Sequence, residues 1–201
     1  MREIFLNNSL NLLCKTYNYD NDTLDKVKYG LEIIYISITK LTFLLICSII
    51  FKTFKETLIF SFFISFIRNY SYGIHAKKSW QCYVSSFIVF IIFPFAVIKI
   101  NLPFLFKIII CLFSLISMIL YAPADTYKRP LVNKEHRKLL KIKSIIFVSI
   151  YSFIIFILND KYYSNIICLA LITQSMLINP FIYKLFKLPY NNYKAYQKGA
   201  A

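Results

Sequence analysis

Long apolar runs alternate with short charged breaks along the chain, and this pattern predicts a bundle of membrane helices. Six runs are apolar enough to cross or enter a membrane: about 33–51, 57–67, 82–98, 103–121, 144–158 and 164–183. The run 57–67 has only 11 residues, which cover roughly half of the hydrocarbon thickness. It either completes a span with its charged flanks or is shielded by protein. We therefore predict one all-α, polytopic integral membrane domain over residues 1–201, with about six transmembrane or re-entrant helices.

The first 30 residues are mixed in character, and we expect interfacial or cytoplasmic helices there. The start, MREIFLNNSLNLLCK, has a short apolar face and lacks the small-residue cleavage site of a signal peptide. An amphipathic helix at the membrane interface fits this pattern. After a loop around NYDND, Asp22 or Thr23 is a suitable N-cap for a helix that continues into the first span.

Composition agrees with a membrane protein. Hydrophobic residues make up 58% of the chain, and 24 Lys and Arg against 9 Asp and Glu give a net charge of +15. Such an excess can indicate nucleic-acid binding, but the lysines lie between apolar runs and no RNA- or DNA-binding motif is present. We therefore expect no nucleic-acid partner. The excess positive charge fits the asymmetry of membrane proteins, with lipid headgroups as contacts.

The basic residues also predict a topology. The segment 122–143 carries seven basic residues from Lys128 to Lys143, so we predict a basic cytoplasmic loop there. Two spans later, the tail 184–201 is basic and is expected on the same side, as is the segment 68–81. Six crossings with both termini in the cytoplasm satisfy this arrangement. Lys52 and Lys55 are exceptions, because they fall on the outer side.

Cysteine and histidine usage excludes several kinds of site. Cys47, Cys111 and Cys168 lie within apolar runs, where a thiol behaves as a small hydrophobic group. The odd count of five cysteines argues against a disulfide framework. The only two histidines, His75 and His136, are far apart and have no further ligands nearby, so we expect no metal. No nucleotide-binding motif is present, and we expect no cofactor.

The most polar feature inside the apolar part of the chain is RNYSYGIHAKKSWQC, residues 68–82. It places His75 and Cys82 seven residues apart, and a thiolate with a histidine base is a common nucleophilic pair. One continuous helix would separate the two by about 10.5 Å along its axis, whereas proton transfer needs heavy atoms about 3 Å apart. We therefore predict that Ser79 caps a helix with Cys82 in its first turn. Gly73 would then let the loop with His75 fold back.

The surroundings of Cys82 favour its thiolate form. The positive end of the helix, Lys77, Lys78 and a protonated His75 all stabilise a negative sulfur, whereas burial in the membrane opposes it. A simpler interpretation exists, in which a solvated loop precedes an ordinary cysteine of a span. Composition alone favours this simpler interpretation, because one histidine and one cysteine at this spacing are a weak signal.

Two motifs change this balance. Arg68, Gly73, His75 and Cys82 resemble the pattern of the AgrB family, the accessory gene regulator B membrane endopeptidases of quorum sensing. A second block, YAPADTYKRPL, resembles the family's Ala-Pro-x-Asp segment through Ala122, Pro123, Asp125 and Pro130, with Arg137 and Lys138 following. The resemblance extends over nearly the whole chain in length, charge and order of apolar runs. Tyr72 is a departure, since many relatives carry a second glycine there.

The resemblance implies a multi-pass cysteine endopeptidase of the cell membrane that acts on a short AgrD-like propeptide. Cys82 would attack a peptide carbonyl near the propeptide's C-terminal part, and His75 would move the proton. A Cys or Ser of the propeptide would then displace the thioester and close a thiolactone or lactone ring. The resemblance also implies a homodimer, with the active site on the cytoplasmic side.

Other residues have both functional and structural interpretations. Arg68 either binds a substrate carboxylate or an oxyanion, or anchors the chain at the interface. Gln81 and Ser86 are weaker supporting candidates beside the nucleophile. Asp125 either orients His75 or, as we favour, forms a turn. Two lysines, Lys40 and Lys107, lie within apolar spans. Such a lysine either is functional or extends its charge to the membrane interface, and we expect the latter for Lys107.

Two other function classes, a membrane peptide transporter and a non-catalytic scaffold, need no nucleophile. The sequence has no pair of aspartates in its spans and no HExxH motif, which disfavours aspartyl and metalloproteases.

Overall fold

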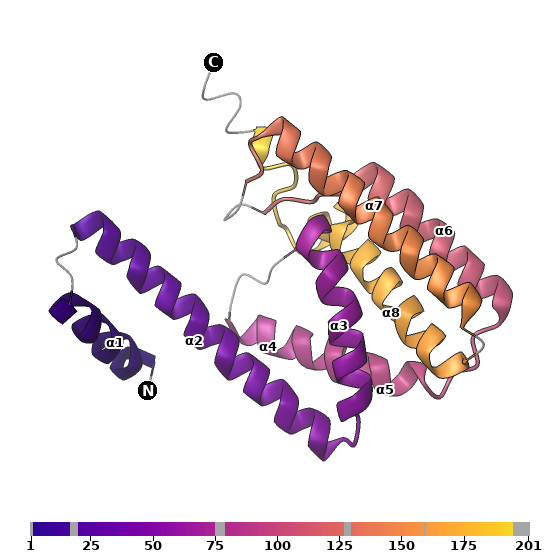
Figure 1. Cartoon of the computed structure of the whole chain (residues 1–201), viewed down its shortest axis with the longest axis horizontal. Helices are drawn as coiled ribbons and strands as arrows, with labels where there is room; N and C mark the ends of the chain where they lie inside the picture. Colours follow the sequence, from indigo (N-terminus) through magenta and orange to yellow (C-terminus); the bar gives the residue numbers. More distant parts are fainter. Residues whose placement is uncertain (1, 17–19, 75–78, 127–129, 159, 195–201) are drawn as a thin grey trace.

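The computed structural model describes residues 2–16, 20–74, 79–126, 130–158 and 160–194, which form an all-α bundle (Figure 1). The helices are α1 (Arg2–Thr16), α2 (Asn21–Ile50), α3 (Phe54–Ser71), α4 (Ser79–Phe87), a π-helical turn η1 (Ile88–Ile92), α5 (Phe93–Val97), α6 (Phe104–Tyr121), α7 (Lys134–Ile157), α8 (Lys161–Ile178) and α9 (Pro180–Leu185). Within the described residues, four stretches are long and apolar enough to cross a membrane: Thr23–Ile50, Trp80–Val97, Phe104–Tyr121 and Lys134–Ile157. The predicted all-α membrane fold is confirmed.

Helix α8 is the central element of the bundle, and it contacts α3, α6 and α7. It buries most of its length, including the polar side chains of Asn165 and Gln174. Helix α3 packs against α8 and α7 through Phe60, Ile64 and Ile67, which are all buried. Polar or charged residues interrupt the apolar sequence of both helices, and protein neighbours provide the partners that lipid cannot. The short run 57–67 belongs to an 18-residue helix that includes its charged flanks, and protein shields its packed face, so the structure has features of both predicted options.

Helix α4, the π-helical turn and α5 form one continuous path from Ser79 to Val97 that crosses beside α2 and α3 (Figure 1). In this wider turn the backbone hydrogen bonds join residues i and i+5 instead of i and i+4. The hydroxyl of Thr57 on α3 donates a hydrogen bond to the carbonyl of Phe90 over 2.9 Å. The path confirms the predicted span 82–98. Ser79 is the first residue of α4 rather than its N-cap, a difference of one residue.

The predicted basic loop 122–143 is wrong over its second half, because α7 already begins at Lys134. The side chain of Asn133 caps this helix by accepting hydrogen bonds from the N–H groups of Glu135 and His136. The sequence from Lys134 to Lys143 contains no proline or glycine, and its buried Leu140 continues into the face that packs on the bundle. The basic residues therefore form the first turns of a span.

Two other predicted boundaries are also wrong. The run 164–183 is not one helix, because Pro180 begins α9 and the side chain of Asn179 accepts a hydrogen bond from the N–H of Phe181. Proline has no N–H to continue α8, so the chain changes direction there. Helix α2 begins after Asp20 rather than after Asp22 or Thr23.

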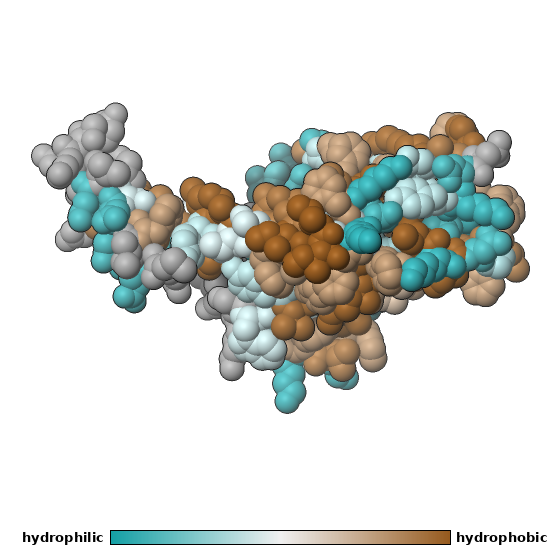
Figure 2. All heavy atoms as spheres, turned by 90° about the horizontal axis from the view of Figure 1, so that it is seen from below, coloured by the Kyte–Doolittle hydropathy of each residue, from teal (hydrophilic) through white to brown (hydrophobic). Residues whose placement is uncertain are grey.

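The outer surface of the helices is apolar. Helix α6 alone exposes many large apolar side chains: Phe104, Leu105, Phe106, Ile109, Leu112, Phe113, Ile116, Ile119 and Leu120. Seen from below, broad areas of hydrophobic atoms cover the middle of the molecule, and hydrophilic atoms gather toward its two ends (Figure 2). A patch of this size is typical of contact with lipid rather than with water. Helix α1 lies beside the first part of α2, where Leu6 is buried.

Candidate active site

The two sequence motifs, around residues 68–82 and 121–131, meet at a short backbone bridge. Helix α3 ends at Ser71, and Tyr72 forms an isolated parallel bridge with Ala124. The Gly73 N–H donates to the carbonyl of Ala124, and the Ala124 N–H donates to the carbonyl of Ser71, each over 3.0 Å. The motifs are separated by about 50 residues in the sequence, and the bridge fixes the segment that leads to His75.

Gly73 is required by both conformation and space. Its φ is +123°, a region that side chains disfavour, and a Cβ there would lie 3.0 Å from the carbonyl oxygen of Leu177. The next N–H, of Ile74, donates to that same oxygen over 3.0 Å. The end of α8 thus touches the active-site segment directly. Gly73 follows the end of α3 in a conformation that favours glycine, whereas the predicted fold-back of the loop with His75 lies outside the described residues.

Gln174 of α8 supports the same segment from inside the bundle. Its side-chain amide donates to the hydroxyl of Ser71 over 2.7 Å and to the carbonyl of Tyr72 over 2.6 Å. The residue is fully buried. Because an unpaired amide is costly in an apolar interior, these bonds fix the position at which α3 ends.

Arg68 lies on the last turn of α3 and faces the same place. Its Nη2 donates to the carbonyl of Ile74 over 2.9 Å, and its charge is within electrostatic range of Tyr183 and Cys82. Burial raises the pKa of Tyr183, and the nearby Asp125 raises it further. Tyr183 therefore stays protonated and donates to the carbonyls of Ala124 and Asp125. Arg68 thus holds Ile74, the last described residue before residue 75, against the end of α3.

Cys82 is the fourth residue of α4 and is half-buried. The Nζ of Lys40, from the middle of α2, lies 3.9 Å from its Sγ. Ser86, one turn further along α4, is buried, and Gln81 is half-buried. Tyr72–Ile74 are not helical, and the described part of α4 starts at Ser79. The predicted break between His75 and Cys82 falls on residues 75–78, which lie outside the described residues, so it stays a prediction.

His75, Lys77 and Lys78 lie outside the described residues, so their predicted roles stay predictions. Asp125 is described and has a structural role. Its two carboxylate oxygens accept hydrogen bonds from the N–H groups of Asn192 and Tyr193, over 2.9 and 2.8 Å. Its side chain is thus engaged with the C-terminal segment, which supports the interpretation of a structural turn.

Four residues of this site were not assigned to it from sequence: Lys40, Gln174, Leu177 and Tyr183. Lys40 and Gln174 did carry a signal, since each is a polar residue within an apolar run. That signal says such a residue has a partner but not which one. Leu177 contributes only its backbone carbonyl, which no side-chain pattern predicts.

Comparison with known proteins places this site in context. The family model AgrB, accessory gene regulator B, matches residues 6–178. An AgrB-like protein of Listeria monocytogenes serovar 1/2a is 35% identical over 174 residues, which cover 86% of this chain and 84% of the relative. The accessory gene regulator protein B of Staphylococcus carnosus is 33% identical over 150 residues, covering 75% and 78%. An AgrB-like protein of Clostridium acetobutylicum is 32% identical over 175 residues, covering 86% and 83%. No solved structure matches the chain.

Proposed function

The chain belongs to the AgrB family, which implies processing of an AgrD-type propeptide, and we propose that it is a membrane cysteine endopeptidase with Cys82 as nucleophile and His75 as base. One observation carries this proposal. The bridge between Tyr72 and Ala124 joins the two family motifs three positions before His75 in the sequence, and Cys82 on α4 lies within electrostatic range of Arg68. A transporter or a scaffold has no need for a half-buried thiol among cations.

The proposed reaction has two acyl-transfer steps. The Cys82 thiolate attacks a carbonyl in the C-terminal part of the propeptide, a sulfur–carbon bond forms, and the peptide carbon–nitrogen bond breaks. His75 takes the thiol proton and gives it to the leaving amine. A thiol or hydroxyl of the propeptide then attacks the thioester. His75 takes the proton of this attacking group, a new sulfur–carbon or oxygen–carbon bond closes the thiolactone or lactone ring, and the bond to Cys82 breaks and releases the thiolate.

A dry site favours ring closure over hydrolysis. Transfer of an acyl group from the Cys82 sulfur to a thiol of the propeptide is nearly balanced in free energy, whereas hydrolysis of the thioester is strongly downhill. Exclusion of water therefore protects the intermediate until the internal nucleophile arrives. The half-buried position of Cys82, beside Lys40 of α2 and within electrostatic range of Arg68 of α3, supports this part of the proposal.

The supporting residues have distinct proposed roles. Arg68 binds a carboxylate of the propeptide or the developing oxyanion, since one of its N–H groups already holds Ile74 in place. Gln81 and Ser86 are supporting residues on the same helix as Cys82. Lys77 and Lys78 add positive charge just before that helix in the sequence. Gly73 sets the turn, and Asp125 supports it through the C-terminal segment.

We further propose that six crossings place both termini and the active site on the cytoplasmic side. The active-site end of α3, the start of α7 and the segment after α8 all belong to the same end of the bundle (Figure 1). This end carries the basic residues of α7, and positive charge favours the cytoplasmic face. Membrane lipids are the expected contacts of the apolar outer surface, and a homodimer is the expected assembly.

The test is co-expression of the chain with a cognate short propeptide, followed by mass spectrometry of peptides and protein. The wild type is expected to yield a shortened peptide and an adduct on Cys82 with the mass of the propeptide's N-terminal part. Cys82→Ala should abolish both. Cys47→Ala, which changes another half-buried cysteine on α2, is the matched control and should process normally. Equal processing by wild type and inserted Cys82→Ala protein would contradict the peptidase and leave transport or scaffolding.

A further inference from the structure

Lys40 lies in the apolar part of α2, between Thr39 and Leu41 and 10 residues before Ile50. At the rise of an α-helix this places it about 15 Å from the Ile50 end. An ammonium group inside a membrane helix is costly, and such groups face protein partners that compensate the cost. The position of Lys40 therefore requires a partner on a neighbouring helix.

The partner is the thiol of Cys82, whose Sγ accepts a hydrogen bond from the Lys40 Nζ over 3.9 Å. Contacts on both sides of this pair fix the register of α2 against α4. The Thr39 and Tyr83 hydroxyls are 2.8 Å apart, and the ring of Phe43 lies edge-on to that of Tyr83 at 5.7 Å. The neighbours of Lys40 and of Cys82 thus meet as well, so the pair follows from the packing of the two helices.

Lys107 provides a contrast within the same protein. It also lies in an apolar helix, but it is in the first turns of α6 and donates to the hydroxyl of Ser164 in the first turn of α8. Its charge therefore sits near a helix end, as predicted. Lys40 has no such explanation, because it is far from both ends of α2 and is directed at a nucleophile.

We propose that Lys40 is an activating residue of the peptidase, whose ammonium holds Cys82 as a thiolate before attack and again when the thioester is released. The catalytic use rests on the proposed function, whereas the pair itself does not. Before attack, the ammonium donates to the negative sulfur and keeps its proton throughout. In the thioester the sulfur is neutral and this attraction is lost. Ring closure restores the thiolate, so Lys40 favours its departure.

Other charged groups act on the same sulfur and must be considered. The guanidinium of Arg68 on α3 interacts electrostatically with the Cys82 thiol. The hydroxyl of Tyr83, the residue after Cys82, is hydrogen-bonded to that of Thr39. Tyr183 of α9 faces Arg68 rather than the thiol. His75, Lys77 and Lys78 lie outside the described residues. Removal of Lys40 should therefore weaken, but not abolish, the stabilisation of the thiolate.

The test measures the alkylation of Cys82 by iodoacetamide as a function of pH, on the full-length protein in lipid nanodiscs, with the extent read for each cysteine by mass spectrometry. Only the thiolate reacts, so loss of a neighbouring cation should move the alkylation curve to higher pH. For Lys40→Met and Lys40→Gln we expect the rate at pH 7 to fall about tenfold. Lys40→Arg should retain most of the rate, and Lys107→Met should match the wild type.

The outcomes separate this inference from the proposed function, because alkylation needs no propeptide. An unchanged alkylation curve in both Lys40→Gln and Lys40→Met, with normal chromatographic profiles, would overturn the role of Lys40 even if Cys82→Ala abolishes processing. A shifted curve supports the pair even if processing does not depend on Cys82. If Lys40→Met does not fold, the same comparison is made with Lys40→Gln and Lys40→Arg.

Discussion

At the scale of single residues, the turn after α3 uses backbone conformations that favour glycine at both Tyr72 and Gly73, so the strain falls on Tyr72. Tyr72 has φ 57° and ψ −132°, a combination that suits glycine, and Gly73 has φ +123°. A side chain in such a region costs about 1–3 kcal/mol. Tyr72→Gly should therefore raise the free energy of unfolding by about 1 kcal/mol, provided that few contacts of the half-buried ring are lost.

This change in stability is measured by thermal unfolding in detergent, with the reactivity of buried cysteines as the signal for unfolding. Gly73→Ala is the opposite control, because its Cβ would meet the carbonyl of Leu177 at 3.0 Å. It should lower the unfolding temperature. A loss of stability in Tyr72→Gly comparable to that in Gly73→Ala would show that the Tyr72 ring matters more than its backbone strain.

Sequence reasoning at this scale identified the residue types of the site but not their neighbours. The need for a turn at Gly73 and the start of a helix ahead of Cys82 follow from glycine and capping preferences. The contacts of Cys82 with Lys40 and of Gln174 with Tyr72 join residues 42 and 102 positions apart. Such contacts depend on how whole helices pack, which a single sequence does not specify.

At the scale of elements, helix existence was predictable and helix ends were not. Apolar runs indicated every long helix, since burial or lipid contact requires them. The start of α7 was missed because lysines were interpreted as a loop, although they are good helix formers and Asn133 supplies the cap. The division between α8 and α9 was missed because apolar residues continue through Pro180.

The same scale gives a prediction for the C-terminal segment, which Asp125 attaches to the connection between α6 and α7. Asp125 is buried and accepts hydrogen bonds from three backbone N–H groups, those of Leu131, Asn192 and Tyr193. The Tyr193 ring also lies under the guanidinium of Arg137 at 3.5 Å. Asp125→Ala leaves these donors without the carboxylate and should cost about 2 kcal/mol or more.

The measurement is the unfolding temperature together with limited proteolysis of the C-terminal segment, which should be cleaved faster in Asp125→Ala. The control is Asp160→Ala, which removes one exposed cap bond to the N–H of Tyr162 and should cost about 1 kcal/mol without faster cleavage there. Equal cleavage in both variants would mean that Asp125 does not hold this segment.

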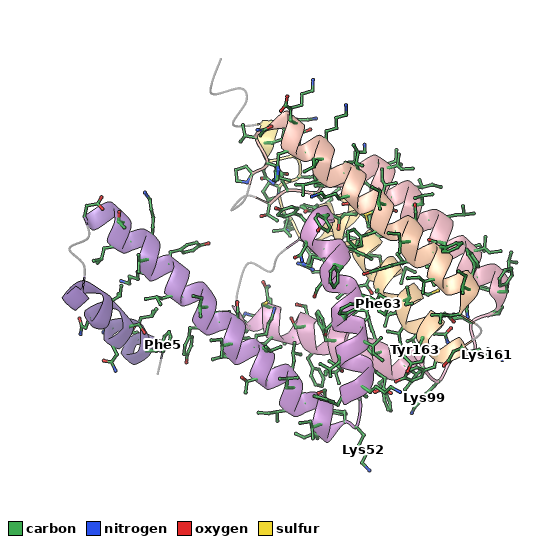
Figure 3. All side chains as sticks on the ribbon, in the orientation of Figure 1. Phe5, Lys52, Phe63, Lys99, Lys161 and Tyr163 are labelled. Atoms are coloured by element: carbon green, nitrogen blue, oxygen red, sulfur yellow. The ribbon has the colours of Figure 1, made fainter. Side chains whose placement is uncertain are left out.

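At the scale of the whole molecule, the arrangement of helix ends makes the topology testable. The end of the bundle where α2 ends and α8 begins carries Lys52, Lys99 and Lys161 (Figure 3). The opposite end carries the start of α7 with Lys134, Arg137 and Lys138, and the segment after α8. Six crossings require that these two sets lie on opposite sides of the membrane, with the more basic set in the cytoplasm.

Single cysteines at exposed positions, in a variant without the five native cysteines, test this requirement. Lys99→Cys and Lys161→Cys should react with a membrane-impermeant maleimide in intact cells, whereas Val132→Cys should react only after the cells are opened. Reaction of all three in intact cells would contradict six crossings, because Val132 would then lie on the same side of the membrane as Lys99 and Lys161. Reversed labelling would keep the fold but turn the site outward, where a propeptide made in the cytoplasm has no direct access. Since Val132 lies between Asp125 and α7, its labelling also reports the side on which the bridge to Tyr72, and hence the nucleophile, is placed.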